Sequence, residues 1–236
     1  MAFAAKSIAP EDLRHALKNW SECHAVITVV AVVALFAGFP VSGFVIALIA
    51  SFGFLIFRFD ARWTASGRFG QANAITLMRL FGVSGLALCA GSASVGFGVF
   101  AAFLFALDAL DGWVARRMGL SSEFGEFFDK EVDALFLLIL GLVLYLGGYV
   151  GGWVLIPGLL RYGFVGYLKF FGDDQLKEQR SRLGCWSYFL IMFAMILSFF
   201  LRPSIYTPML LLMTILLCLS FADSLRRLRG PAKFGG

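Results

Sequence analysis

Long apolar runs alternate with short polar connections along most of the chain. The runs end at Gly, Pro and clusters of charge, which commonly interrupt or flank membrane-spanning helices. Because one span needs about 20 mainly apolar residues, the pattern predicts eight helical spans and no sizeable soluble domain. The predicted spans cover residues 25–39, 41–57, 74–91, 95–113, 129–147, 152–169, 184–201 and 207–223.

The residues before the first predicted span have a different pattern. Pro10 is followed by two acidic residues, as at the start of a helix, and Leu13, Leu17 and Trp20 then recur on one helical face. We therefore predict a short helix that lies on the membrane surface. The same acidic residues, and the lack of a short apolar core before a small-residue cleavage site, argue against a cleavable signal peptide.

The composition supports a membrane protein. Of the 236 residues, 60% are hydrophobic and only 15% are charged, well below the quarter that is typical of soluble domains. The four cysteines are widely spaced and form no CxxC pair, so we interpret them as small apolar side chains rather than disulfides or metal ligands. The predicted fold is all-α, a polytopic membrane helix bundle.

The basic residues lie toward one side of the predicted bundle. With both termini in the cytoplasm, the external connections hold one basic residue, Arg202, and Arg161 falls within a span. The other eighteen of the 20 Lys and Arg lie toward the inner side, as the positive-inside rule requires. The net charge of +5 is therefore interpreted as membrane topology, and no nucleic-acid partner is expected.

Four aspartates lie at the predicted cytoplasmic ends of two consecutive spans. Asp108 and Asp111, three residues apart, share one helical face, and Asp129 and Asp133, four residues apart, share a face of the next helix. Two antiparallel helices can therefore direct four carboxylates at one point. Such carboxylates would repel one another without a counter-charge, and hard oxygen ligands favour Mg²⁺ or Mn²⁺ over zinc. The sequence thus predicts a metal site, with two ions expected.

Small residues and one arginine accompany the aspartates. Gly112 and Ala115 lie on the face of the first aspartate pair, and Gly125 lies one turn before the second pair, so backbones or a ligand can approach closely. Magnesium usually shares its coordination sphere with phosphate oxygens, which Arg116 could also hold. The pattern favours phosphoryl-type transfer at the membrane surface. A solvated helix end remains the alternative for any one aspartate taken alone.

These residues match a known signature. From Asp108 to Asp133 the chain reads Asp-x2-Asp-Gly-x2-Ala-Arg-x8-Gly-x3-Asp-x3-Asp, which resembles the signature of the CDP-alcohol phosphotransferase family without a mismatch. The segment "ANAITLMR", with Asn73, Thr76 and Arg79, is similar to the Asn-x-x-Thr-x-x-Arg segment of the same family.

The resemblance covers residues 70–225, the six-helix family core. Outside it the sequence predicts a surface helix and two extra spans in residues 1–69 and a basic cytoplasmic tail in residues 226–236. The resemblance implies an integral membrane enzyme, commonly a homodimer, that transfers a phosphatidyl group from CDP-diacylglycerol to an alcohol and releases CMP in phospholipid biosynthesis. Some members instead transfer a phosphoalcohol from a CDP-alcohol to a lipid. With the charge asymmetry, it predicts a bacterial inner-membrane protein that contacts membrane lipids and has its active site toward the cytoplasm.

The same resemblance implies roles for individual residues. Asp108, Asp111 and Asp129 would bind the metals, and Asp133 would be the general base and contact a metal as well. The residues that would hold the CDP moiety or pack the motif are Asn73, Thr76, Arg79, Gly112, Ala115, Arg116 and Gly125.

The signature does not identify the acceptor alcohol. Arg161 lies within a span, so we expect it to face the bundle interior, and Lys169, Arg180 and Arg182 cluster near the cytoplasmic end of the following segment. A basic pocket suits a phosphorylated polyol such as glycerol 3-phosphate or inositol phosphate. Positive-inside charge and lipid contact explain the last three cations almost as well. An amino-alcohol or a lipid acceptor therefore stays open.

Two other classes of membrane protein use acidic clusters. Membrane prenyltransferases hold magnesium-diphosphate on aspartate-rich motifs of well-separated helices, whereas this chain has one compact motif pair. A cation channel or transporter would place acids near the bilayer midplane, without an arginine beside them. Two further acids lie near the motif: Glu126, one turn before Asp129, could support a metal ligand, and Glu131 points away from the aspartates. Both are interpreted as mostly solvated surface.

Overall fold

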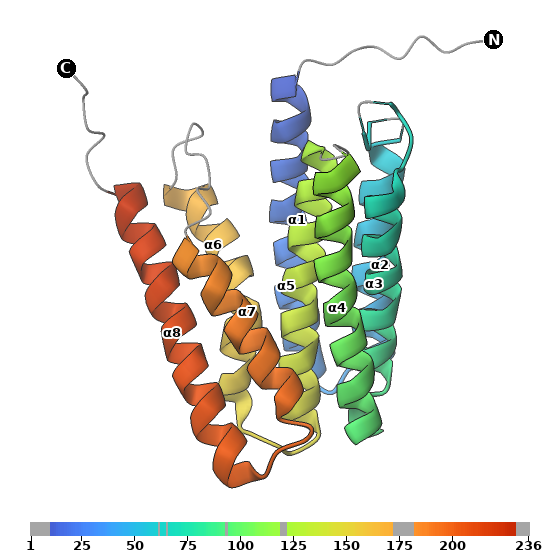
Figure 1. Ribbon diagram of the computed structural model, residues 1–236. Helices are drawn as coiled ribbons and strands as arrows, with labels where there is room; N and C mark the ends of the chain where they lie inside the picture. The colour runs from blue at the N-terminus through green and yellow to red at the C-terminus, as the bar shows by residue number, and fades with distance from the viewer. Residues whose placement is uncertain are drawn as a thin grey trace.

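The computed structural model describes residues 10–60, 62–64, 66–92, 94–118, 122–171 and 182–229, with the side chains of all of these except 10, 11, 92, 109–118, 171, 182, 183 and 227–229. Within this part of the chain there are eight α-helices, two short 3-10 helices and no strand (Figure 1). The α-helices are α1 (Pro10–Phe36), α2 (Val41–Arg58), α3 (Gln71–Leu88), α4 (Val95–Met118), α5 (Glu123–Leu146), α6 (Ile156–Phe171), α7 (Arg182–Leu197) and α8 (Pro203–Arg229). The prediction of an all-α helix bundle is confirmed.

The lengths and composition of the helices fit a polytopic membrane protein. Three helical stretches in the described residues are long and apolar enough to cross a membrane, namely Asp12–Phe36, Val41–Arg58 and Pro203–Arg226. Val95–Asp108 and Gly184–Leu197 are shorter apolar stretches. Large apolar side chains are also exposed along the outer helices, as expected where lipid rather than water surrounds the bundle.

α5 is the central helix of the bundle. It packs against α3, α6, α7 and α1, and α3 packs in turn against α4. Almost every α5 side chain from Val132 to Leu144 is buried, which is the pattern of a helix covered on all sides. A side chain in this part of α5 therefore faces a neighbouring helix, and its position around the helix decides which one.

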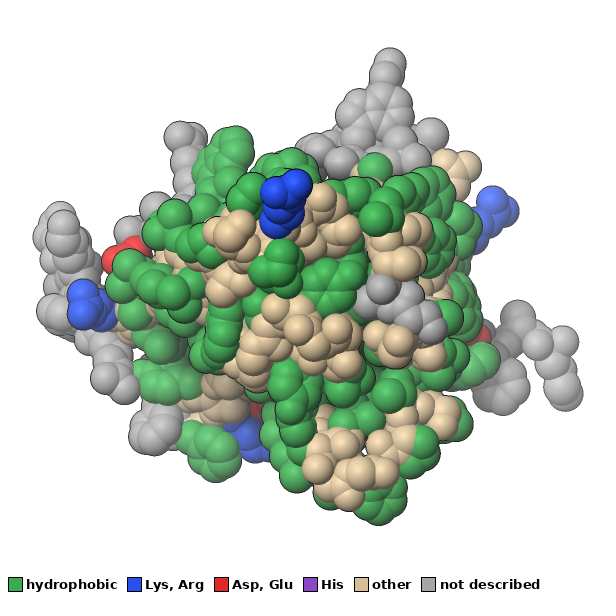
Figure 2. Space-filling view, turned by 90° about the horizontal axis from the view of Figure 1, so that it is seen from below, with side chains coloured by type: hydrophobic (Ala, Val, Ile, Leu, Met, Phe, Trp, Pro, Cys, Tyr) green, Lys and Arg blue, Asp and Glu red, His purple; other side chains and the backbone are tan. Residues whose placement is uncertain are grey.

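The two ends of the bundle differ in charge. α1 begins, α8 ends and α5 begins at the same end, at the top of Figure 1. Figure 2 looks at the opposite end, where apolar and uncharged side chains dominate and Lys, Arg, Asp and Glu are few. The described residues of the connections at this end include one basic residue, Arg202. The structure thus keeps the charge asymmetry that the sequence showed.

The residues predicted to form a separate surface helix are the first turns of α1. The helix runs from Pro10 to Phe36 without a break. Leu17 and Trp20 are buried inside the protein, and the Trp20 indole donates a hydrogen bond to the main-chain oxygen of Ser51 in α2, at 3.1 Å. The apolar face of this segment therefore packs on protein rather than on the membrane surface.

Candidate active site

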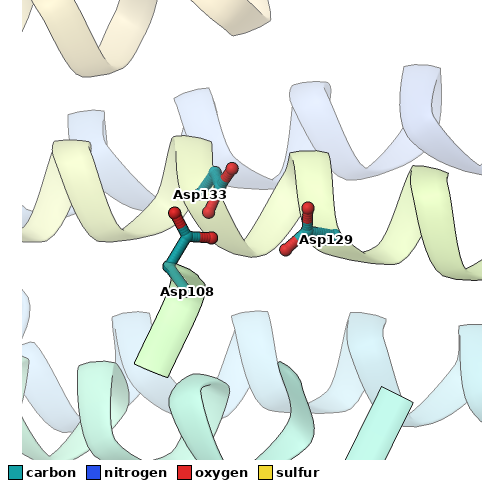
Figure 3. Close-up of side chains that lie close together, drawn as sticks. All are labelled: Asp108, Asp129 and Asp133. Atoms are coloured by element: carbon teal, nitrogen blue, oxygen red, sulfur yellow. The ribbon is translucent and has the colours of Figure 1, made fainter. Parts of the chain in front are cut away.

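Three aspartates from two helices converge toward the end of the bundle at which α5 begins. Asp108 comes from α4, whereas Asp129 and Asp133 lie one turn apart on α5, and Figure 3 shows their carboxylates facing one another. One carboxylate oxygen of each residue lies within 4.8 Å of the others. Their side chains are 24%, 30% and 18% exposed, so the cluster is partly buried yet reachable from outside.

Arg79 of α3 lies among the three carboxylates. Its Nη1 is 2.8 Å from Asp108 Oδ1 and 3.0 Å from Asp129 Oδ1, and its Nη2 is 2.7 Å from Asp133 Oδ1. The arginine side chain is fully buried. One guanidinium therefore links α3, α4 and α5 through ion pairs, and those with Asp129 and Asp133 are also hydrogen bonds, which the planar fork of arginine is well shaped to make.

The carboxylate cluster fits a divalent cation. Its oxygens are the hard ligands that Mg²⁺ and Mn²⁺ prefer. Three carboxylates and the single guanidinium of Arg79 carry a formal charge of −2, which one divalent ion would neutralise. The donor set therefore agrees with the kind of metal that the sequence predicted.

The starts of α3 and α5 are held close together. A Cβ atom on Gly125 would lie 2.7 Å from Asn73 Oδ1 and 3.0 Å from Ser122 Oγ, so a larger residue there would force the Asn73 side chain to shift. Ser122 caps α5: its Oγ accepts a hydrogen bond from the Gly125 N–H and donates one to the Trp63 carbonyl, at 3.0 and 2.6 Å. The motif glycine thus has a packing role.

Two polar residues of α3 predicted to line the CDP pocket are buried. The Asn73 amide donates to the Phe69 carbonyl at 2.6 Å, and the Thr76 hydroxyl donates to the Ala72 carbonyl at 3.2 Å. Both side chains thus bond to main-chain oxygens four residues earlier, at the start of α3 or just before it. Four further predicted residues lie on α4, but their side chains fall outside the described part of the structure: Asp111, Gly112, Ala115 and Arg116.

The family model for CDP-alcohol phosphatidyltransferase matches residues 69–221, well over half of the chain. The chain belongs to this family. The match begins just before α3 and ends within α8, so it contains Arg79 and all three aspartates of the cluster, while α1 and α2 precede it. The chain is therefore a transferase of phospholipid biosynthesis that moves a phosphoalcohol or phosphatidyl group from a CDP-linked donor within a membrane. Enzymes of this family use divalent metal, in agreement with the aspartate cluster.

In this CDP-alcohol phosphatidyltransferase, the two predicted acceptor cations whose side chains the structure describes pair with glutamates. Arg161 faces the interior, as predicted, with its Nη2 2.9 Å from Glu131 Oε1. Lys169 Nζ pairs with Glu22 of α1 at 3.0 Å. The structure does not bring either cation to the aspartate cluster. Arg180 and the side chain of Arg182 lie outside the described residues.

The interpretation of Glu131 as solvated surface is wrong. Glu126 is largely exposed and pairs with Lys130, but the Glu131 side chain is fully buried. Glu131 Oε1 accepts hydrogen bonds from Arg161 and from Ser21 Oγ of α1, at 2.9 and 2.6 Å. Sequence spacing showed that Glu131 points away from the aspartates, but not that α1 and α6 cover that side of α5.

A tyrosine of α7 also reaches the site and was not predicted. The Tyr188 hydroxyl donates a hydrogen bond to the main-chain oxygen of Asp133 at 3.3 Å. α7 thereby contacts the helix turn that presents the proposed base. Nothing in the sequence around Tyr188 indicated this contact, because it depends on how α7 packs against α5.

Proposed function

We propose that this CDP-alcohol phosphatidyltransferase transfers the phosphatidyl group of CDP-diacylglycerol to an alcohol and releases CMP. The observation that carries the proposal is the convergence of Asp108, Asp129 and Asp133 beside Arg79, within the family match. An anionic, partly exposed cluster on membrane helices suits a diphosphate substrate that arrives in the bilayer and binds through divalent cations.

Asp133 is the proposed general base. As the acceptor oxygen bonds to phosphorus, its proton passes to the Asp133 carboxylate, and the bond between phosphorus and the CMP oxygen breaks. Arg79, 2.7 Å from Asp133 Oδ1, keeps that carboxylate in place. Asp108, Asp111 and Asp129, with Asp133, would hold Mg²⁺ or Mn²⁺, which when bound stabilises negative charge on the diphosphate oxygens. A two-metal arrangement belongs to the proposal.

The CDP moiety would be held by residues of α3, α4 and α5. Arg116 would bind phosphate oxygens, and the small residues Gly112 and Ala115 would leave room for the ligand beside the α4 backbone. Asn73, Thr76 and Gly125 would shape the pocket from α3 and α5, a role consistent with their close packing.

The acceptor that we propose is a phosphorylated polyol, such as glycerol 3-phosphate or an inositol phosphate. The proposal rests on the basic residues of α6 and the segment after it. Arg161 and Lys169 already pair with Glu131 and Glu22, so the acceptor phosphate would depend chiefly on Arg180 and Arg182. We further propose a homodimer in a bacterial inner membrane, with the site toward the cytoplasm.

The first prediction concerns the reaction itself. Purified protein in nanodiscs with CDP-diacylglycerol and Mg²⁺ is expected to release CMP only when one alcohol from a panel is present: glycerol 3-phosphate, inositol phosphate, inositol, serine or choline. Asp133→Asn should lower this rate by about 10²- to 10⁴-fold, since it removes the proton acceptor. Removal of the metal with EDTA should stop release.

Glu126→Gln is the matched control, because it removes a carboxylate from an exposed site on the same helix. It should retain the wild-type rate. The proposed reaction would be contradicted if none of the alcohols in the panel supported CMP release. It would also be contradicted if Asp133→Asn released CMP at the wild-type rate.

A further inference from the structure

A second buried ionic cluster lies on α5, away from the proposed metal site. The Glu131 side chain is fully buried, and its Oε1 receives two hydrogen bonds, from Ser21 Oγ of α1 at 2.6 Å and from Arg161 Nη2 of α6 at 2.9 Å. The Arg161 side chain is itself only 14% exposed. One carboxylate oxygen therefore joins three helices.

This cluster lies on the side of α5 opposite the aspartates. Successive residues of an α-helix are rotated by about 100°, so a residue two positions from both Asp129 and Asp133 points roughly 180° from their mean direction. Glu131 is that residue. Any rotation or sliding of α5 that disturbs the Glu131 contacts therefore also displaces the two metal-binding candidates.

The cluster extends to helices that precede the family match. His24 of α1 stacks on Trp20, with ring centroids 4.8 Å apart, and its Nδ1 lies 2.9 Å from Ser51 Oγ of α2. The Trp20 indole also bonds to the main-chain oxygen of Ser51. α1 and α2 are thus joined by buried polar contacts, and α1 is joined to α5 through Ser21.

Burial of an ion pair is poorly explained by stability alone. Apolar side chains of similar volume often replace such a pair with no loss of stability, because removing two charges from water is costly. In some proteins a buried polar or ionic group instead specifies the register in which helices pack, because its hydrogen bonds are directional. A buried carboxylate with two donors is therefore well suited to setting the position of a helix.

We propose that Glu131 is a positioning residue: Ser21 and Arg161 hold it so that α5 presents Asp129 and Asp133 in the geometry that binds metal. α1, although outside the family match, is then part of the catalytic unit. The inference rests on the proposed metal site, and its test therefore measures metal binding directly rather than turnover alone.

The test uses the full chain in nanodiscs and Mn²⁺ as the probe, with free Mn²⁺ followed by EPR. The variant is Glu131→Leu/Arg161→Leu, which removes both charges together and leaves neither one unpaired. We expect thermal unfolding close to wild type. The Mn²⁺ dissociation constant should rise, and kcat fall, by about 10- to 100-fold, with KM for CDP-diacylglycerol unchanged when it is measured at saturating Mn²⁺.

Arg14→Gln/Glu123→Gln is the matched control. This pair also joins α1 to α5, at 2.8 Å, but its side chains are 49% and 35% exposed. Surface ion pairs contribute little, so Mn²⁺ binding should not change. If Glu131→Leu/Arg161→Leu does not fold, Ser21→Ala removes one hydrogen bond and should weaken Mn²⁺ binding by about two- to fivefold.

Two results would overturn the inference in different ways. Wild-type Mn²⁺ affinity in a folded Glu131→Leu/Arg161→Leu variant, or in Ser21→Ala, would remove the positioning role and leave the proposed function intact. Wild-type protein that binds no Mn²⁺ would remove the metal site, and the positioning role with it.

Discussion

At the scale of single residues, Arg79 gives the aspartate cluster a counter-charge from within the chain. It contacts Asp108, Asp129 and Asp133 at 2.7–3.0 Å and is fully buried. The family resemblance assigned Arg79 to the CDP pocket, whereas its contacts are with the carboxylates. A charged residue inside a membrane helix requires a partner. The position of Arg79 within a predicted span is therefore the feature of the sequence that indicates an acidic partner for it.

The residue-scale prediction concerns Arg79→Met. In metal-free buffer the variant should lose about 3–5 kcal/mol of unfolding free energy, because three partly buried carboxylates lose the cation that pairs with each of them. Mg²⁺ should then stabilise the variant more than it stabilises wild type. Thermal unfolding in detergent, with EDTA or Mg²⁺, measures both effects.

Arg79→Lys keeps the charge but loses the planar fork, so its stability should fall between those of wild type and Arg79→Met. An Arg79→Met protein that unfolds at the wild-type temperature in EDTA would show that the three ion pairs do not stabilise the bundle.

At the scale of helices, α5 is placed by close contacts as well as by ion pairs. A Cβ on Gly158 of α6 would lie 2.4 Å from the Cα of Leu138, and one on Gly141 of α5 would lie 2.8 Å from the carbonyl oxygen of Val154. Backbone therefore closely approaches backbone between α5 and both α6 and the segment that leads into α6. Small residues permit such an approach in membrane proteins.

The helix-scale prediction concerns Gly158→Ala. The added methyl group meets the α5 backbone, which cannot move aside as a side chain can, so the variant should be destabilised by about 1–3 kcal/mol. Gly163→Ala is the control on the same helix, since a Cβ there meets nothing within 4 Å. Thermal unfolding of the two variants should differ clearly; equal unfolding temperatures would contradict the close contact.

Helix positions were predicted well from the sequence, and helix contacts were not. All eight predicted spans correspond to helices, but α5 begins at Glu123 rather than near 129, because Ser122 caps it. Periodicity placed the aspartates on shared faces, because that relation is local. The burial of Glu131 and the contact of Tyr188 depend on which helices surround α5, which local spacing does not contain.

At the scale of the whole molecule, the charge asymmetry predicts an orientation that can be measured. Cys89 is exposed at the end of the bundle opposite the start of α1, and Ser66 is exposed near the other end. If the positive-inside rule holds here, the first end is external and the second is cytoplasmic.

In a variant that keeps Cys89 as its one cysteine, a membrane-impermeant maleimide should label the protein in intact, right-side-out vesicles. In a variant whose one cysteine comes from Ser66→Cys, the maleimide should label the protein only after the vesicles are permeabilised. The reverse pattern would invert the proposed topology and place the site on the other side of the membrane.

The three contacts of Arg79 also bear on how the chain enters the bilayer. α3 is synthesised before α4 and α5, so its buried arginine reaches the translocation machinery before any of its three aspartates has been made. An arginine in a lone span costs about 2.5–3.5 kcal/mol at the membrane centre. α3 is therefore expected to integrate poorly when expressed by itself and efficiently when α4 and α5 follow it, which makes these three helices a single unit of membrane insertion.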